Sequence, residues 1–173
     1  NMRLHNIEAI LFDSGKVLNA PQSGHWFISP KFFNHVNKSA FDNINMEKRN
    51  RAFFIAGDYI NSITMIKTKE EEYEHFRKYY DIFSKALPEL QLQDEAVNGL
   101  AGDLTYNAEK YKFFEDAIHV IPMLFEKYKL AVVSDAWPSL KDVFIHAGFD
   151  SYFSSFVISS VIGVTKPNKK MYL

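Results

Sequence analysis

The sequence contains no cysteine, and its 173 residues include only six prolines and seven glycines. Without cysteine the chain has neither a disulfide framework nor a thiolate nucleophile. This fits a reducing cytoplasm, where we expect the protein. Acidic and basic side chains nearly balance, with a formal net charge of −1. Charge therefore gives no reason to expect binding to nucleic acid or to an anionic membrane. No apolar run approaches the length of a membrane span.

Aromatic side chains are what the sequence has in plenty. They make up 16% of the residues, with sixteen phenylalanines and nine tyrosines, so we expect a core rich in rings. Hydrophobic residues at 47% and charged residues at 24% are ordinary for a globular protein. The length suits one domain with a small inserted one.

The first candidate functional residue is Asp13, which follows a short apolar run. Residues 7–12 predict a buried strand, and the turn after Asp13 contains Gly15. A carboxylate at the carboxyl end of a buried strand lies where open α/β sheets bind their ligands. Asp13 is therefore a candidate nucleophile or metal ligand, the alternative being a carboxylate that only caps the turn.

A long helical block follows, after an irregular connection at residues 19–30. Apolar spacing predicts helices at about 46–64 and 94–106, and a third that begins at Thr68 and stops before Pro88. Residues 70–72 are all glutamate and predict a solvated helix start. The third helix also carries rings at helical spacing, which predict the core of this block: Tyr73, Phe76, Tyr80 and Phe83.

The last third of the chain alternates between strands and helices. It predicts a helix at 116–128, strands at 129–134 and 156–160, and a helix from Pro138 to Gly148. This order favours a parallel sheet with right-handed crossovers. The helical block is too long for one crossover. We therefore expect a discontinuous α/β core, residues 2–18 and 112–173, with a helical cap domain inserted at residues 19–111.

Three polar residues lie at or just after strand ends: Asp13, Ser134 and Lys166. The carboxyl ends of parallel strands share one edge of a sheet, so these side chains are expected to converge. A carboxylate, a hydroxyl and an ammonium suit phosphoryl transfer as nucleophile, hydrogen-bond donor and charge-balancing cation. The alternatives without a catalytic role are a helix N-cap at Ser134 and a solvated loop lysine at Lys166.

These segments resemble three motifs of the haloacid dehalogenase-like (HAD) hydrolase superfamily, in its subgroup with a helical cap. The segments are Phe12-Asp-Ser-Gly-Lys-Val-Leu18, Val132-Val-Ser-Asp135 and Gly163-Val-Thr-Lys-Pro167. The resemblance implies a Rossmann-like parallel sheet and a phosphatase that acts on a small phosphorylated metabolite. Asp13 would attack phosphorus, Ser134 and Lys166 would bind phosphate, and Mg²⁺ would bind the Asp13 carboxylate and the Gly15 carbonyl.

Three further residues are candidate substrate contacts. Lys16 is close enough to Asp13 to reach a substrate anion, although a solvated lysine is an equal alternative. Asp135 could orient the phosphate-binding loop. His25 lies in the link to the cap with Trp26, and both could line the pocket or simply pack there. The sequence does not indicate an oligomeric state.

The match to the superfamily has two departures. Phosphatases of the family usually carry a second aspartate two residues after the nucleophile, and here Gly15 stands there. Loss of a positioned acid typically lowers the rate by about 10²–10⁴-fold, which leaves open an impaired relative that binds a phosphorylated ligand or a protein. The dehalogenase branch would show Tyr-Gly-Thr from position 15, so haloacid dehalogenation is disfavoured.

The second departure concerns a fourth, acidic motif that would follow Lys166, whereas the sequence ends at Leu173. We therefore expect the C-terminal part of the core to be missing, with at least one strand and the remaining metal carboxylates. The sequence is then a fragment or a truncated relative. We favour a fragment, because a sheet that ended here would expose an unpaired apolar edge.

Overall fold

A parallel sheet of three strands organises the computed structural model, which describes residues 7–173. The strand order is β1 (Ala9–Phe12), β4 (Lys129–Ser134) and β5 (Ser155–Ile158), with β4 in the middle. Four consecutive apolar residues of β4, Leu130–Val133, are buried, as expected for a parallel strand covered on both faces. The predicted parallel sheet is confirmed, while residues 2–6 of the predicted core lie outside the described residues. The prediction that the first strand is buried is wrong: β1 lies at one side of the described sheet, and its Leu11 is 51% exposed.

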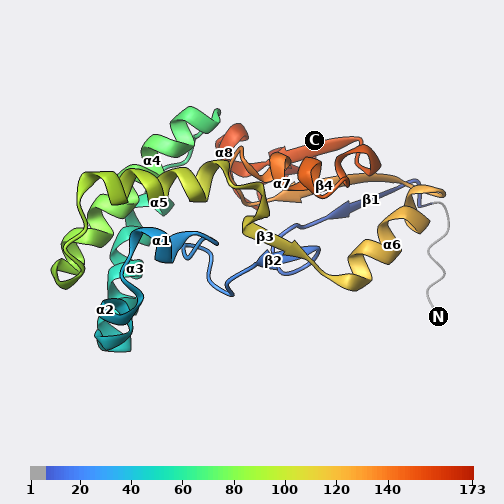
Figure 1. Ribbon diagram of the computed structural model, residues 1–173. Helices are drawn as coiled ribbons and strands as arrows, with labels where there is room; N and C mark the ends of the chain where they lie inside the picture. The colour runs from blue at the N-terminus through green and yellow to red at the C-terminus, as the bar shows by residue number, and fades with distance from the viewer. Residues whose placement is uncertain (1–6) are drawn as a thin grey trace.

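Helices flank this sheet (Figure 1). α6 (Glu115–Phe125) precedes β4, α7 (Leu140–His146) joins β4 to β5, and α8 (Ser159–Ile162) follows β5. Side chains of α6 and α7 share one hydrophobic cluster with strand residues; its members include Ala117, Ile121, Leu130, Val132, Val143 and Phe144. Within the described part of the chain, no helix is both long and apolar enough to cross a membrane.

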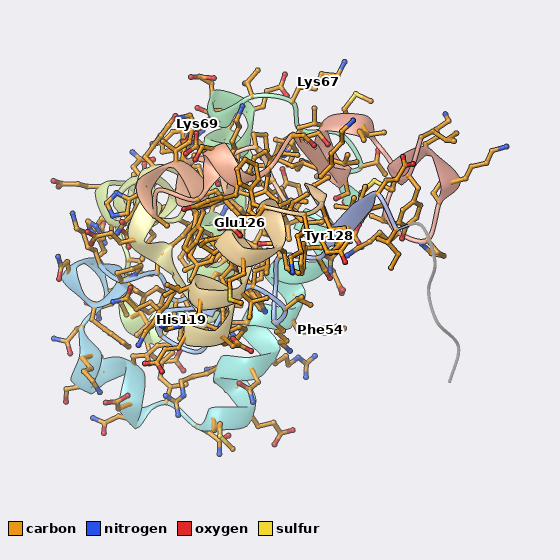
Figure 2. All side chains as sticks on the ribbon, turned by 90° about the vertical axis from the view of Figure 1, so that its right-hand side faces the viewer. Phe54, Lys67, Lys69, His119, Glu126 and Tyr128 are labelled. Carbon is orange, nitrogen blue, oxygen red and sulfur yellow. The ribbon has the colours of Figure 1, made fainter. Side chains whose placement is uncertain are left out.

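The helical block lies at the other end of the molecule (Figure 1). It consists of α1 (Phe32–His35), α2 (Lys38–Asn43), α3 (Met46–Ser62), α4 (Lys69–Ala86) and α5 (Asp94–Tyr106). The predicted helices in this block are confirmed to within two residues. α3 is amphipathic as expected: Phe53 is buried, whereas Phe54 on another side of the helix is 67% exposed (Figure 2).

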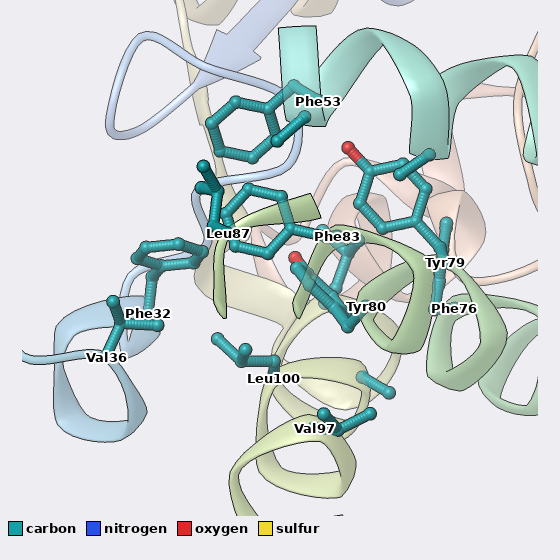
Figure 3. Close-up of a cluster of buried hydrophobic side chains, with 14 of the residues drawn as sticks. Phe32, Val36, Phe53, Phe76, Tyr79, Tyr80, Phe83, Leu87, Val97 and Leu100 are labelled. Atoms are coloured by element: carbon teal, nitrogen blue, oxygen red, sulfur yellow. The ribbon is translucent and has the colours of Figure 1, made fainter. Parts of the chain in front are cut away.

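Aromatic rings fill the centre of the block, as the composition predicted (Figure 3). Phe76, Tyr80 and Phe83 of α4 are each at most 1% exposed. The rings of Phe53 and Phe83 lie 4.6 Å apart between centroids, within the range of favourable aromatic pairs. Three rings of the predicted α4 stripe are therefore core, and Leu100 of α5 is buried in the same cluster. Tyr73, the fourth ring, is only partly buried and packs against the cluster.

An antiparallel ribbon that the sequence analysis missed lies at the junction of the two regions. β2 (Asn19–Pro21) pairs with β3 (Tyr111–Phe113), with Asn19 opposite Phe113 and Pro21 opposite Tyr111. The prediction of an irregular connection is therefore wrong for residues 19–21. The ribbon covers both predicted boundaries of the cap, and the division into two domains at these points stays a prediction.

A buried polar cluster also joins the two regions. The Ser139 hydroxyl donates to Glu72 Oε1 at 2.5 Å and accepts from Lys110 Nζ at 2.5 Å, and the Ser139 amide donates to Glu72 Oε2 at 2.8 Å. Glu72 is 0% exposed and Lys110 is 4% exposed. The predicted solvated helix start is therefore wrong for Glu72, because its carboxylate binds the segment after β4.

Candidate active site

Asp13 lies just beyond the end of β1, and two of the predicted site residues contact its carboxylate. Lys166 Nζ is 2.7 Å from Asp13 Oδ2. The Ser134 hydroxyl donates to Asp13 Oδ1 at 3.1 Å, and the Ser14 amide donates to the same oxygen at 2.7 Å. The structure thus brings together a carboxylate and a hydroxyl from two strand ends and an ammonium from the loop after α8. The expected convergence is present, although Lys166 lies eight residues beyond the end of β5 and not at a strand end.

Lys166 is held from two sides. Its ammonium also donates to the carbonyl oxygen of Val133 at 3.4 Å, and its backbone amide donates to Asp135 Oδ1 at 3.0 Å. The Lys166 side chain is 22% exposed and that of Asp13 is 41% exposed. The contact of Asp135 fits a residue that orients the lysine segment.

The turn after Asp13 is fixed by Ser14, which is 1% exposed. The Ser14 carbonyl accepts from the Leu18 amide at 2.8 Å, and its hydroxyl accepts from Asn19 Nδ2 at 2.9 Å. Lys16 closes the turn in the left-handed region, at φ +61°, and its side chain is exposed. Asp13 therefore stands on an ordered loop, with Lys16 at the rim.

A cavity of about 330 Å³ opens beside these residues. The predicted residues that line it are Asp13, Gly15, Lys16, Ser134, Asp135 and Lys166. It also has lining residues that the sequence analysis did not propose: Phe27, Asn61, Tyr111 and Trp137. Of these four, only Trp137 could have been predicted from the sequence, because it lies three residues after Ser134. A second cavity of about 720 Å³ shares Asn61, Trp137 and Lys166 with the first.

His25 is not among the residues that line the first cavity. Its ring packs against Phe53 of the helical block, with centroids 4.4 Å apart, and its Nδ1 accepts from the Phe27 amide at 3.2 Å. Burial lowers the pKa of His25 from its ordinary value. This arrangement gives no support to a substrate contact by His25, and its neighbour Trp26 lines the cavity instead.

Gly15, at the position of the missing acid, faces the ring of Trp26. A Cβ atom on Gly15 would lie 3.0 Å from Trp26 Cη2 and 3.4 Å from Cζ2. The shorter distance is tighter than most real contacts of a Cβ atom, so a side chain at position 15 would require the ring to shift by a few tenths of an ångström. Trp26 therefore covers the space that a side chain at this position would use.

The donor set for Mg²⁺ is small. Across residues 7–173, no group of three or more histidine and acidic side chains is placed to hold a metal. The site offers one carboxylate, Asp13, and the backbone carbonyl of Gly15. Mg²⁺ usually keeps several waters and takes one or two carboxylates together with substrate phosphate. The residues present therefore fit the protein's share of a metal that binds with a phosphate, and not a metal site made by the protein alone.

No family model matches this sequence, and no curated protein is significantly similar to it. Solved structures do share its fold. The HAD-hydrolase YfnB from Bacillus subtilis, whose structure contains magnesium, superposes with a TM-score of 0.58 at 14% identity, over 95% of this chain and 69% of that one. L-2-haloacid dehalogenase from Xanthobacter autotrophicus superposes with a TM-score of 0.59 at 16% identity, over 96% of this chain and 62% of that one.

A HAD phosphatase from Thermococcus onnurineus gives a TM-score of 0.56 at 17% identity, over 96% of this chain and 68% of that one. The chain thus spans roughly two thirds of the length of these three proteins. They include a phosphatase and a dehalogenase, so the likeness alone does not choose between the two activities. The arrangement of the sheet and the helical block is the fold of these HAD-superfamily hydrolases.

Proposed function

We propose that this chain carries the nucleophile and the phosphate-binding residues of a phosphomonoester hydrolase that acts on a small metabolite. The observation that supports this most is the contact of Asp13 with Lys166 and Ser134 at the wall of one cavity. Residues 19–111 act as a cap beside the site in this proposal. A cytoplasmic location, suggested by the lack of cysteine, belongs to the same proposal.

The chemistry follows from the two donors on Asp13. Lys166 and Ser134 hold the carboxylate in place and are also within reach of phosphate oxygens beside it. An Asp13 oxygen forms a bond to phosphorus, the ester P–O bond breaks, and the leaving oxygen departs with its electron pair. Water then attacks the phosphorus of the aspartyl-phosphate, which releases inorganic phosphate and restores Asp13. The lysine and serine stabilise the charge on the transferring group.

Mg²⁺ belongs to this proposal as the ion that neutralises phosphate charge when bound. Asp13 and the Gly15 carbonyl would hold it, and Lys16 and Asp135 at the rim would adjust the position of the substrate.

The test is phosphate release from a panel of sugar phosphates, nucleotides and an aryl phosphate, with and without Mg²⁺. Asp13→Asn should lower release by about 10³-fold or more, because the amide cannot act as the nucleophile. Asp58→Asn makes the same chemical change at an exposed residue of α3 and should leave release unchanged. Release that is unaffected by Asp13→Asn would overturn the mechanism. If the protein releases no phosphate from any ester but releases chloride from 2-chloropropionate, its activity is dehalogenation.

The second candidate is a chain that binds a phosphorylated ligand without turnover. The coverage of Gly15 by Trp26 favours it, because the family's usual acid has neither a side chain nor free space here. Saturable binding of beryllium fluoride, lost in Asp13→Asn, together with no phosphate release from any ester, would select this candidate over the first.

A further inference from the structure

The cavity beside Asp13 has an unusually aromatic lining. Four of its lining residues carry rings: Trp26, Phe27, Tyr111 and Trp137. Ligand cavities commonly combine apolar, aromatic walls with a few polar groups that fix orientation. Here the polar groups include Asp13 with its two partners, Ser134 and Lys166. Other polar side chains in the lining are Lys16, Asn61 and Asp135. The lining therefore offers one end for a phosphate and another for a flat apolar group.

The two tryptophans are braced by other rings. Trp137 packs edge-on against Phe76 of α4, with centroids 5.1 Å apart and an interplanar angle of 75°. Trp26 packs edge-on against Tyr111 of β3, at 5.2 Å and 83°. Both are only partly buried, so each retains surface for a ligand. Walls held in this way lose little freedom when a ring packs on them.

The same cavity lacks the acid that relatives usually carry at position 15 to protonate a leaving oxygen. Two other charged groups of the lining have partners already: Asp135 accepts from the Lys166 amide, and the Lys166 ammonium pairs with Asp13. Gly15 contributes no side chain, and the space above it is taken by Trp26. Tyr111 supplies a hydroxyl, but burial raises its pKa above the ordinary value, which makes it a weaker acid. A phenol ionises near pKa 10, about six powers of ten more readily than water. Phenolate is therefore a far better unassisted leaving group than an alkoxide.

We propose that the cavity takes phosphate monoesters of phenols, with the aromatic ring bonded directly to the ester oxygen and packed against Trp26 and Trp137. This rests on the proposed phosphatase function and narrows it to one substrate class. Asp13 forms the bond to phosphorus, and the phenolate leaves with the electron pair of the broken P–O bond. The phenolate then takes a proton from water.

Three esters separate the two parts of this inference, the aromatic ring and the phenolate leaving group. Phenyl phosphate has both, benzyl phosphate has the aromatic ring with an alkoxide leaving group, and cyclohexyl phosphate has a saturated ring with an alkoxide leaving group. We expect kcat/KM to fall in that order, by about tenfold or more at each step. Cyclohexyl phosphate hydrolysed as fast as phenyl phosphate, in a reaction lost in Asp13→Asn, would overturn the inference and leave the phosphatase proposal intact.

If no ester is hydrolysed, the phosphatase proposal is overturned, but the preference for an aromatic ring can still be tested by ligand binding. Trp26 and Trp137 are the two tryptophans of the sequence, so intrinsic tryptophan fluorescence reports on this cavity. We expect phenylphosphonate, which has no ester oxygen to break, to change the emission and to bind about tenfold or more tightly than cyclohexylphosphonate. Equal affinities would overturn the inference.

Variants locate the ring. Trp137→Leu and Trp26→Leu should each weaken phenylphosphonate severalfold or more and leave cyclohexylphosphonate nearly unchanged, while Trp137→Phe restores the preference because it keeps an aromatic face. Phe54→Leu is the matched control, since Phe54 is 67% exposed on α3 (Figure 2) and is absent from the cavity lining. A preference for the aryl ligand that survives both leucine variants in folded protein would contradict the assignment.

Discussion

Two clusters in this molecule use the same three chemical groups in opposite settings. At the candidate site, a carboxylate meets a serine and a lysine beside a cavity, with Asp13 41% and Lys166 22% exposed. At the junction with the helical block, Glu72 meets Ser139 and Lys110, with side chains 0% and 3% exposed for the acid and the lysine.

Access to a ligand, rather than group type, distinguishes the two sets, because the Asp13 set lines a cavity whereas the Glu72 set is buried. Burial of the junction cluster raises the pKa of Glu72 and lowers the pKa of Lys110 to about 8. Its hydrogen bonds attach α4 to the segment after β4, the same segment that carries Trp137. Asp13 and its partners keep part of their surface open to the cavity, so a phosphate can take their hydrogen bonds.

The largest expected effect is on stability, from Lys110→Met. The change leaves the Glu72 carboxylate buried without its cation, and removal of one partner of a buried pair typically costs about 3–5 kcal/mol. Urea unfolding should show this loss. Lys112→Met, at an exposed residue of β3, is the control and should change stability by less than about 0.5 kcal/mol. A loss below about 1 kcal/mol for Lys110→Met would show that the junction cluster is not a stabilising pair.

Lys166→Met should have the opposite effects, a large loss of activity and a small loss of stability. Loss of a charge that stabilises the transferring phosphoryl group should lower kcat/KM by about 10²–10³-fold. Stability should change by less than about 1 kcal/mol, because the pair is partly exposed. The measurement is kcat/KM for phenyl phosphate beside urea unfolding of the same samples. A large loss of stability with unchanged turnover would place Lys166 with the structural cluster.

The pH dependence of stability separates the clusters further. Burial lowers the pKa of Lys110 from 10.5 to about 8, so between these values the unfolded chain binds more protons at this residue than the folded chain. This contribution to stability therefore rises with pH, is complete above about 10.5, and is lost as pH falls through about 8. The difference in unfolding free energy between the unchanged protein and Lys110→Met should grow by about 2 kcal/mol from pH 8 to pH 10. A constant difference would contradict the low pKa.

The two serines give the most closely matched comparison and the smallest effects. Ser134→Ala removes one donor to Asp13 and should lower kcat/KM by about tenfold, equivalent to about 1.4 kcal/mol. Ser139→Ala leaves Glu72 and Lys110 each short of a buried partner and should lower stability by about 1–3 kcal/mol. Each variant is the control for the other when kcat/KM and unfolding free energy are both measured. Equal changes of both quantities in the two variants would contradict the distinction between the clusters.

The sequence predicted the parts of the fold that depend on local pattern. The apolar run of β4 and the position of Asp13 after β1 placed Asp13 and Ser134 at one sheet edge, which is where the structure has them. Lys166 reaches the same edge from the loop after α8. The β2–β3 ribbon was missed because it pairs two three-residue segments about 90 positions apart. Neither segment is long enough to show strand periodicity.

The junction cluster was missed for a similar reason. Glu72 follows two other glutamates at a helix start, a setting that usually indicates solvent. Only the tertiary contact with Ser139, 67 residues away, reveals its burial. The aromatic wall of the cavity was predicted only at Trp26. Phe27, Tyr111 and Trp137 complete it from three segments that the fold brings together.

The contact of Trp26 with Gly15 has a consequence for how this site can change over generations. Gly15 does not have a positive φ, so its backbone accepts an aspartate, and only the ring 3.0 Å from the added Cβ opposes it. Gly15→Asp therefore requires the Trp26 ring to move by a few tenths of an ångström, whereas the same substitution after Trp26→Ala meets no ring. The two positions are thus coupled, and the cost of acquiring the acid differs with the order of the two substitutions. A protein that uses Trp26 to hold its ligand would have to shift that contact to gain the acid.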